Sequence, residues 1–149
     1  MFRGQFAHSI DAKGRISLPS RFRDVLMRDG ESRFVVTPAL FDPCLHVYPL
    51  GVWEIFEQRI AELPNLDQHI IRFRRLYVSA AVECELDKAH RVLVPQDLRE
   101  RVDLTKEALW AGVGKYMELW SKPRFEQAME ISAEEQEAFK LAVMEKIRV

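Results

Sequence analysis

The stretch IDAKGRISLPSRFRD, from Ile10 to Asp24, decides the fold because it occurs twice. Its second copy is LDKAHRVLVPQDLRE, from Leu86 to Glu100. A shift of 76 residues, from 10 to 86, brings four identities into register: Asp11 with Asp87, Arg15 with Arg91, Pro19 with Pro95 and Arg23 with Arg99. Apolar residues match between these positions as well. Such self-similarity indicates an internal duplication, in which each copy is one supersecondary unit.

Each copy has the pattern of two short strands, a helix and two further strands. Residues 5–10 alternate polar and apolar, as a half-buried strand does, and alternation resumes at 15–18 after a turn. We therefore expect a β-hairpin or a closely related crossing of these strands. The expected strands are 5–10, 15–18, 34–37, 44–48, 82–86, 91–94, 108–113 and 116–120. The expected helices are 21–27, 52–63, 67–79, 96–102, one beginning near Pro123, and an acidic one over 132–149.

These elements predict an α+β fold with a shared core. One repeat alone cannot bury its apolar face, so we expect the two repeats to interleave around a pseudo-twofold axis, with helices flanking the strands. The expected division is a first repeat over residues 1–55, a helical bridge over 56–80, a second repeat over 81–130 and a C-terminal acidic helix over 131–149. On the bridge, Arg72, Arg74 and Arg75 are interpreted as a solvated helix face.

Composition indicates a folded cytoplasmic protein and excludes several classes. The chain has 149 residues, of which 48% are hydrophobic and 30% charged. No apolar run approaches the roughly 20 residues of a membrane span, and the N-terminus lacks the layout of a secretion signal. Cys44 and Cys84 are expected to be buried thiols; a disulfide between them is disfavoured in a reducing compartment.

Catalysis and metal binding have no support in the sequence. The four histidines lie outside any His, Cys, Asp and Glu cluster at ligand spacing, and no nucleotide-binding or nucleophile-elbow motif is present. His8 and His46 fall in strand patterns and are interpreted as packing residues. We therefore predict no enzyme activity, catalytic residue, metal, cofactor, small-molecule substrate or membrane partner.

Charge is distributed unevenly along the chain. The net charge of −1 argues mildly against a nucleic-acid binder. Residues 1–24, however, hold five basic and two acidic side chains, whereas the tail from Glu126 onward holds six acidic and three basic ones. A basic face can therefore exist on a nearly neutral protein.

The D-x-x-x-R turn is the strongest chemical signal. Asp11 is short enough to cap the turn or to pair with Arg15 and fix its guanidinium. An arginine held in this way suits phosphate oxygens or a guanine edge. The candidate DNA-binding residues are Arg15, Lys13, Arg3, Asp11, Arg91, Lys88 and Asp87. The alternative is that the Asp–Arg pairs are salt bridges that hold the turns without any ligand; Arg23 and Arg99 are expected to cover apolar surface with their stems.

The motif DAKGRISLPSRFR resembles the AbrB-type swapped-hairpin DNA-binding domain. Two copies in one chain, with MFRGQF, PCLHVYPLGVWE, RRLYVSAAVECELD and GVGKYMELWS, resemble the bacterial MraZ family over residues 1 to about 130. The resemblance implies two tandem swapped-hairpin repeats in a barrel-like core. It also implies a nucleoid-associated transcriptional regulator that binds short direct repeats in double-stranded DNA upstream of its own division and cell-wall operon, as a ring-shaped homo-oligomer.

Two points stay open beside this resemblance. The rival function is an antitoxin-like or scaffolding protein whose acidic C-terminal helix binds a protein partner. The second copy also has His90 where the first has Gly14. Positive φ is disfavoured for a non-glycine residue, although histidine is among the more tolerant types. We therefore expect the second turn to differ in shape, Arg15 to be a stronger DNA contact than Arg91, or His90 itself to reach a phosphate.

Overall fold

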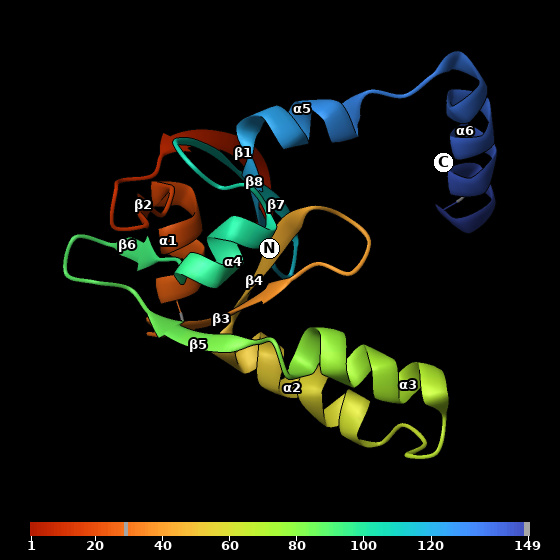
Figure 1. Ribbon diagram of the computed structural model, residues 1–149, viewed down its shortest axis with the longest axis horizontal. Helices are drawn as coiled ribbons and strands as arrows, with labels where there is room; N and C mark the ends of the chain where they lie inside the picture. The colour runs from red at the N-terminus through yellow and green to blue at the C-terminus, as the bar shows by residue number, and fades with distance from the viewer. Residues whose placement is uncertain (29, 148–149) are drawn as a thin grey trace.

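The computed structural model describes residues 1–28 and 30–147, and its strands form two sheets (Figure 1). Six strands form one sheet in the order β1-β7-β8-β4-β3-β5, and β2 pairs with β6 in a two-stranded ribbon. The strands are β1 (Phe2–Ser9), β2 (Arg15–Ser17), β3 (Arg33–Pro38), β4 (Cys44–Pro49), β5 (Val82–Glu85), β6 (Arg91–Leu93), β7 (Glu107–Gly114) and β8 (Met117–Ser121). All pairings are antiparallel. The predicted α+β class is confirmed.

The helices also fall where the sequence predicts them. They are α1 (Ser20–Met27), α2 (Leu50–Ala61), α3 (Gln68–Phe73), α4 (Gln96–Arg101), α5 (Lys122–Met129) and α6 (Ala133–Ile147). A π-helical segment, η1 (Arg74–Val78), continues α3, so the predicted helix over 67–79 is present with a widened last part. Asp67 caps its start, because its side chain accepts the backbone N–H groups of His69 and Ile70. The last two residues of the predicted tail helix lie outside the described residues.

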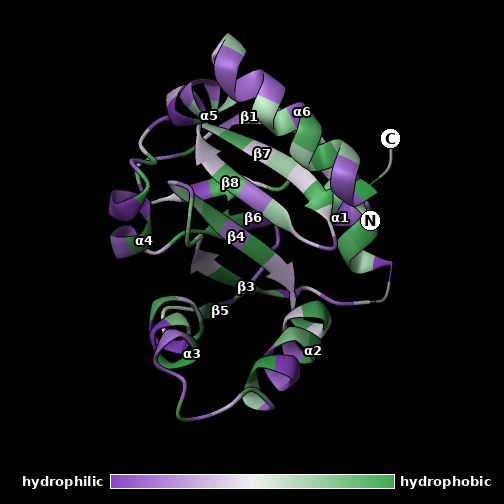
Figure 2. Cartoon of the chain, turned by 90° about the vertical axis from the view of Figure 1, so that its right-hand side faces the viewer, coloured by the Kyte–Doolittle hydropathy of each residue, from purple (hydrophilic) through white to green (hydrophobic). Residues whose placement is uncertain are grey.

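The two repeats interleave around a pseudo-twofold axis. The counterparts in the two repeats are β1 and β5, β3 and β7, and β4 and β8. When each strand of the large sheet is replaced by its counterpart, the strand order is the same one read from the opposite edge. The axis therefore passes between β4 and β8, the central pair (Figure 2). Among the described strands, β1 and β5 are the unjoined edges of this sheet, so its hydrogen bonds form an open sheet rather than a closed barrel.

The first two strands of each repeat do not form a hairpin with each other. They form the crossing that we expected as the alternative. β1 pairs along its length with β7, and β2 pairs with β6, so both strands take partners from the other repeat. In the described residues, a single bridge between Ile10 and Ile16 joins the first repeat's own two strands. Neither repeat completes its hydrogen bonding alone, which is why two copies are needed for one core.

The main core lies between the large sheet, the β2–β6 ribbon and helices α1 and α4. At equivalent positions of the two repeats, a larger core side chain at one position is balanced by a smaller one at the next. In the register of the sheet, Trp110 and Ala108 take the places that Val36 and Phe34 have in the first repeat. All four are buried, and the Trp110 Nε1–H donates to the backbone oxygen of Ser17 at 3.1 Å. Large and small residues are thus exchanged while the core stays filled.

The other face of the sheet carries α2, α3 and η1, which enclose a second, aromatic core (Figures 1 and 2). Arg74 corrects the prediction of a solvated arginine face on this bridge. Its guanidinium donates to the backbone oxygens of Ile60 and Leu63, at 2.8 and 3.1 Å, and to the side chain of Asn65 at 2.8 Å. Arg74 therefore adds hydrogen bonds to carbonyl groups at the C-terminal end of α2 and just after it.

Both cysteines were expected to be buried thiols. Cys44 and Cys84 are free; Cys44 is buried as expected, whereas Cys84 is partly exposed.

Helix α6 buries none of its side chains and stands apart from the sheets (Figure 1). No helix in the described part of the chain is long and apolar enough to cross a membrane.

Candidate nucleic-acid interface

The β2–β6 ribbon presents the two motif arginines on one face. Ile16 lies opposite Val92, and both side chains are buried in the main core. The alternation of side chains along a strand turns Arg15 and Arg91 to the opposite, outer face. In the register, Arg15 lies opposite Leu93 and Arg91 lies opposite Ser17. The two arginines are therefore diagonal neighbours, whose Cα atoms are typically about 7–8 Å apart. A pair of arginines therefore stands on a short antiparallel ribbon whose other face is anchored.

In the first turn Asp11 accepts four hydrogen bonds, which close the turn and hold Arg15. The Asp11 carboxylate accepts the backbone N–H groups of Lys13 at 3.0 Å and Arg15 at 2.9 Å, and its Oδ2 accepts the Nε–H of Arg15 at 2.7 Å. The Asp11 carbonyl accepts the Gly14 N–H at 3.0 Å. Asp11 thus closes the turn and aims the guanidinium with the same carboxylate, as the sequence predicted.

The second turn repeats this arrangement bond for bond. The Asp87 carboxylate accepts the backbone N–H groups of Ala89 and Arg91, each at 2.9 Å, and the Arg91 Nε–H at 2.9 Å. The Asp87 carbonyl accepts the His90 N–H at 2.9 Å. His90 adopts φ +58°, within the left-handed region, while Gly14 has φ +88°. The prediction that histidine changes the shape of the turn is therefore wrong.

The electrostatics of both turns favour charged pairs. Bonds to the backbone N–H and then to the guanidinium of Arg15 hold the pKa of Asp11 below its ordinary value, and Arg91 does the same to the pKa of Asp87. Of the guanidinium donors of its arginine, each carboxylate accepts the Nε–H. Within residues 1–28 and 30–147, no protein acceptor hydrogen-bonds the Nη groups of either arginine. Both forked donor ends are therefore available to a ligand.

Each turn is also supported by the helix of the other repeat, which sequence reasoning missed. The Arg99 guanidinium lies against Gly14, where a Cβ would come within 2.6 Å of its Cζ and Nε. Symmetrically, the Arg23 Nη1 lies 3.4 Å from His90 Nδ1. Two backbone bonds complete the crossing: Val94 N–H to Gly14 O at 2.9 Å and Leu18 N–H to His90 O at 3.1 Å. The identity of Arg23 and Arg99 between the copies was the available signal for this contact.

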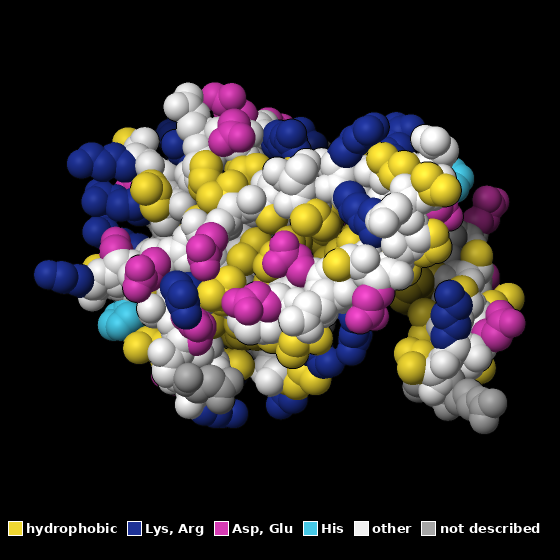
Figure 3. Space-filling view, turned by 90° about the horizontal axis from the view of Figure 1, so that it is seen from below, with side chains coloured by type: hydrophobic (Ala, Val, Ile, Leu, Met, Phe, Trp, Pro, Cys, Tyr) yellow, Lys and Arg dark blue, Asp and Glu magenta, His cyan; other side chains and the backbone are white. Residues whose placement is uncertain are grey.

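The remaining predicted basic residues divide between two places. Lys13 and Lys88 are exposed at the tips of the two turns, near the arginines. Lysine and arginine side chains gather at this end of the molecule, on the left in Figure 3, where Figure 1 draws the turns. Arg3 lies elsewhere, near the start of β1, in a surface hollow with Arg21 and Arg28. The structure thus brings together six of the seven predicted residues and leaves Arg3 apart from them.

Comparison with known proteins agrees with the duplication. A family model described as "MraZ protein, putative antitoxin-like" matches residues 1–75 and again residues 77–144. A Pediococcus pentosaceus protein named "Transcriptional regulator MraZ" is 42% identical over 134 residues, covering 90% of each chain. A protein of the same name from Carboxydothermus hydrogenoformans is 46% identical over 122 residues, covering 82% of each. A third, from Pseudomonas aeruginosa, is 44% identical, covering 82% of this chain and 81% of the relative.

Proposed function

The chain belongs to the MraZ family of transcriptional regulators, which are not enzymes, and from this membership we propose that it binds double-stranded DNA sequence-specifically through the β2–β6 ribbon. Its targets are short direct repeats upstream of its own division and cell-wall operon. It acts in the cytoplasm on the nucleoid. Arg15 and Arg91 read the DNA, Asp11 and Asp87 orient them, and Lys13, Lys88 and Arg3 contact phosphates.

The single observation that carries the proposal is the way both arginines are held. Each is fixed by its Nε–H, while its two Nη groups lack a protein acceptor among the described residues. A salt bridge whose only role was to close the turn would not need this outward fork, because the backbone bonds to Asp11 already close it. The B-DNA major groove, about 12 Å wide, admits a two-stranded ribbon, and an arginine fork matches guanine O6 and N7.

Assembly reconciles this patch with the net charge of −1. One ribbon offers two arginines and two lysines, which is a small electrostatic footprint. In a homo-oligomeric ring the same ribbon recurs around the assembly, and direct repeats in the DNA present matching sites. Binding of one subunit then raises the effective concentration of the next, so modest contacts add up to a high avidity.

The test is binding of the purified protein to DNA from upstream of its own gene, against scrambled DNA, at several salt concentrations. Arg15→Ala is expected to lower affinity for the upstream DNA by about 1–3 kcal/mol per engaged site, because a base contact is lost. Lys13→Ala is the matched control at the tip of the same turn. It should weaken binding to both DNAs alike and reduce the salt slope by about one, as the loss of a phosphate contact does.

Equal and weak binding to both DNAs, unchanged by Arg15→Ala, would contradict the proposal and leave the Asp–Arg pairs as structural salt bridges. Loss of binding together with loss of the fold would be recognised by circular dichroism. Arg15→Lys then separates the two roles, since it keeps the charge but removes the fork.

A second candidate function is partner binding by α6. This helix buries no residue, yet it exposes Phe139, Leu141, Met144 and Ile147 among acidic side chains. Deleting the chain after Ile131 tests it. A truncated protein that keeps its DNA affinity but loses a protein partner supports this function for the tail, whereas unchanged partner binding excludes it.

A further inference from the structure

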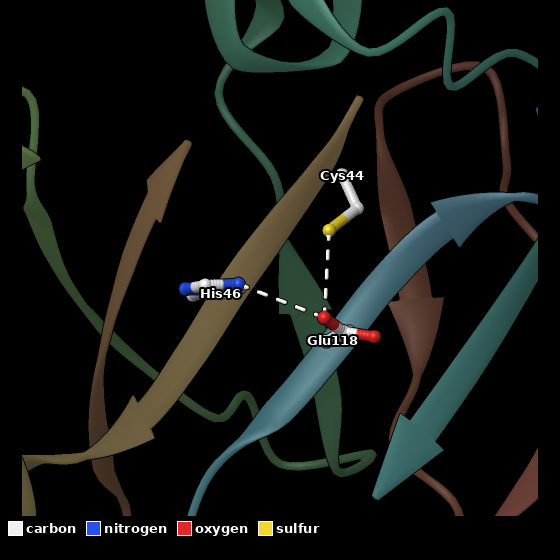
Figure 4. Close-up of side chains that lie close together, drawn as sticks. All are labelled: Cys44, His46 and Glu118. Atoms are coloured by element: carbon white, nitrogen blue, oxygen red, sulfur yellow. Dashed lines mark hydrogen bonds and ion pairs between the residues drawn. The ribbon is translucent and has the colours of Figure 1, made fainter. Parts of the chain in front are cut away.

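A second group of functional side chains lies away from the turns, at the pseudo-twofold axis of the large sheet (Figure 4). Cys44 and His46 come from β4 and Glu118 from β8. His46 and Glu118 face each other directly in the register of these central strands, and Cys44 lies two residues earlier on the same face. One ligand atom of each residue, a sulfur, an imidazole nitrogen and a carboxylate oxygen, all lie within 4.8 Å of one another.

Neighbouring side chains occupy the other polar atoms of this cluster. His46 Nδ1 lies 2.6 Å from the Tyr77 hydroxyl, and that hydroxyl lies 2.6 Å from the hydroxyl of Tyr48. The Glu118 Oε1 accepts the Nε1–H of Trp120 at 3.0 Å. A neutral His46 that donates from Nδ1 presents an unprotonated Nε2. These contacts therefore leave His46 Nε2 and Glu118 Oε2 directed at one another.

The separations fit one metal ion after a small contraction. His46 Nε2 lies 3.7 Å and Cys44 Sγ 3.9 Å from Glu118 Oε2. Zinc bonds of about 2.3 Å to sulfur and about 2.0 Å to nitrogen or oxygen, in tetrahedral geometry, place ligand atoms roughly 3.3–3.7 Å apart. These two pairs have to close by only a few tenths of an ångström, whereas Cys44 Sγ and the His46 nitrogen, which lie within 4.8 Å of each other, have to close by up to about 1 Å. Histidine ligands whose second nitrogen is hydrogen-bonded are the usual arrangement at zinc sites.

We propose that Cys44, His46 and Glu118 bind a single zinc ion, with water as the fourth ligand. The donor set of one sulfur, one nitrogen and one oxygen suits this borderline ion better than magnesium or calcium, which prefer oxygen alone. Burial raises the pKa of the Cys44 thiol, so in the metal-free protein it is protonated. On binding, the S–H bond breaks, the sulfur forms the bond to zinc and the proton leaves to solvent.

The position of the site gives the ion a structural role. It joins β4 of the first repeat to β8 of the second at the centre of the six-stranded sheet. The side chains of His46 and Glu118 are 15% and 16% exposed, which leaves a route for the ion and a place for the water. Zinc therefore clamps the two repeats together at their axis, independently of the arginine turns.

The sequence did not predict this site because its ligands are far apart in the chain. Cys44 and His46 form only a C-x-H pair, and Glu118 follows 72 residues later. The usual zinc motifs have their ligands in closely spaced pairs. Only the pairing of β4 with β8 across the axis brings the third ligand to the other two.

The test is a titration of the full-length, tag-free protein with cobalt(II), after removal of bound metals with a chelator. Cobalt takes the place of zinc and reports a thiolate ligand by a sulfur-to-metal charge-transfer band in the near ultraviolet. We expect this band to saturate at one cobalt per chain and to disappear when zinc is added. X-ray absorption of the zinc-loaded wild-type protein should show one sulfur in the first shell, a readout that needs no variant.

Variants then assign the ligands. Cys44→Ser should abolish the band, and His46→Ala and Glu118→Gln should each weaken cobalt binding at least tenfold. Tyr77→Phe, which removes the partner of His46 Nδ1, should weaken it by about 10- to 100-fold, as the loss of an outer-shell partner does. Cys84→Ser is the matched control, since it removes the other free thiol and should leave band and stoichiometry unchanged.

Three results would overturn the proposal. They are an absence of the band in the wild-type protein, a band that survives Cys44→Ser, and a band lost in Cys84→Ser. The wild-type titration and the X-ray measurement need no substitution. They therefore test the proposal even if a variant fails to fold.

Discussion

The turns of the two repeats reach the same geometry with different residues at the same position. Gly14 and His90 both have positive φ, and the hydrogen bonds around them match. Glycine enters this region at little steric cost, whereas histidine does so at a cost that its surroundings must offset. The His90 ring offsets part of this by lying against Arg23, while the missing side chain of Gly14 makes room for Arg99. The Asp–Arg hydrogen bonds, and not the glycine, therefore define the turn.

The repeats differ more at their tips than at their arginines. Both arginines are held through Nε by an aspartate four residues earlier, at 2.7 and 2.9 Å. The tip lysine is the third residue of the first turn, Lys13, but the second residue of the second turn, Lys88. The two turns are thus equivalent as holders of an arginine and inequivalent in where they add positive charge.

Replacing the residue with positive φ should destabilise the first turn strongly and the second turn little. Gly14→Ala forces a side chain into φ +88° and into the Arg99 guanidinium, which now donates to the Val94 carbonyl at 3.0 Å. We expect the free energy of unfolding to fall by about 2–4 kcal/mol, from backbone strain and a weakened hydrogen bond. His90→Gly should change it by less than about 1 kcal/mol, because relief of strain and added chain entropy oppose each other. Urea denaturation measures both.

The variant His90→Gly also tests whether His90 contacts a phosphate of the DNA. The structure engages Nδ1 of His90 with Arg23, and we expect the DNA affinity of His90→Gly to equal that of the wild type at each salt concentration. A loss of affinity with a lower salt slope would assign His90 a phosphate contact. A large loss of stability in His90→Gly would instead contradict the equivalence of the two turns.

Arg91→Ala measured beside Arg15→Ala sharpens the comparison at the ribbon. Since both guanidinium groups are oriented alike, we expect each substitution to weaken binding to upstream DNA by about 1–3 kcal/mol per engaged site. The measurement is a competition assay with upstream and scrambled DNA. A loss confined to Arg15→Ala would show that the oligomer presents only the first repeat to DNA, even though the turns are equal in the subunit.

Acid should affect the two turns equally, and this is the smallest of the expected effects. The folded-state pKa values of Asp11 and Asp87 lie below the usual value of 3.8. Each ionised carboxylate therefore adds stability that is fully present above pH 3.8 and is lost as the pH falls through the lower, folded-state pKa. Asp11→Asn and Asp87→Asn should each make the decline of stability between neutral pH and pH 2 shallower, by similar amounts. Urea unfolding at stepped pH measures this; unequal slopes would contradict the equivalence of the turns.

Local features were predictable from the sequence because their causes lie within a few residues. The turn needs an aspartate and an arginine four residues apart, and within the described residues the carboxylates of Asp11 and Asp87 bond to residues two and four positions later. Alternation and helical spacing likewise placed the strands and helices, since both report local periodicity. The repeat itself required only comparison of Ile10–Asp24 with Leu86–Glu100.

The sequence by itself thus determined the duplication, the elements, the Asp–Arg turns and the family. Only the tertiary structure decided which strands pair, that Arg23 and Arg99 support the opposite turns, that Arg74 caps α2, and that Glu118 meets Cys44 and His46. The physical reason is the range of the interactions. Strand exchange is selected by the burial of one shared core from segments far apart in the chain, and no local pattern of hydrogen bonds or hydrophobicity records that choice.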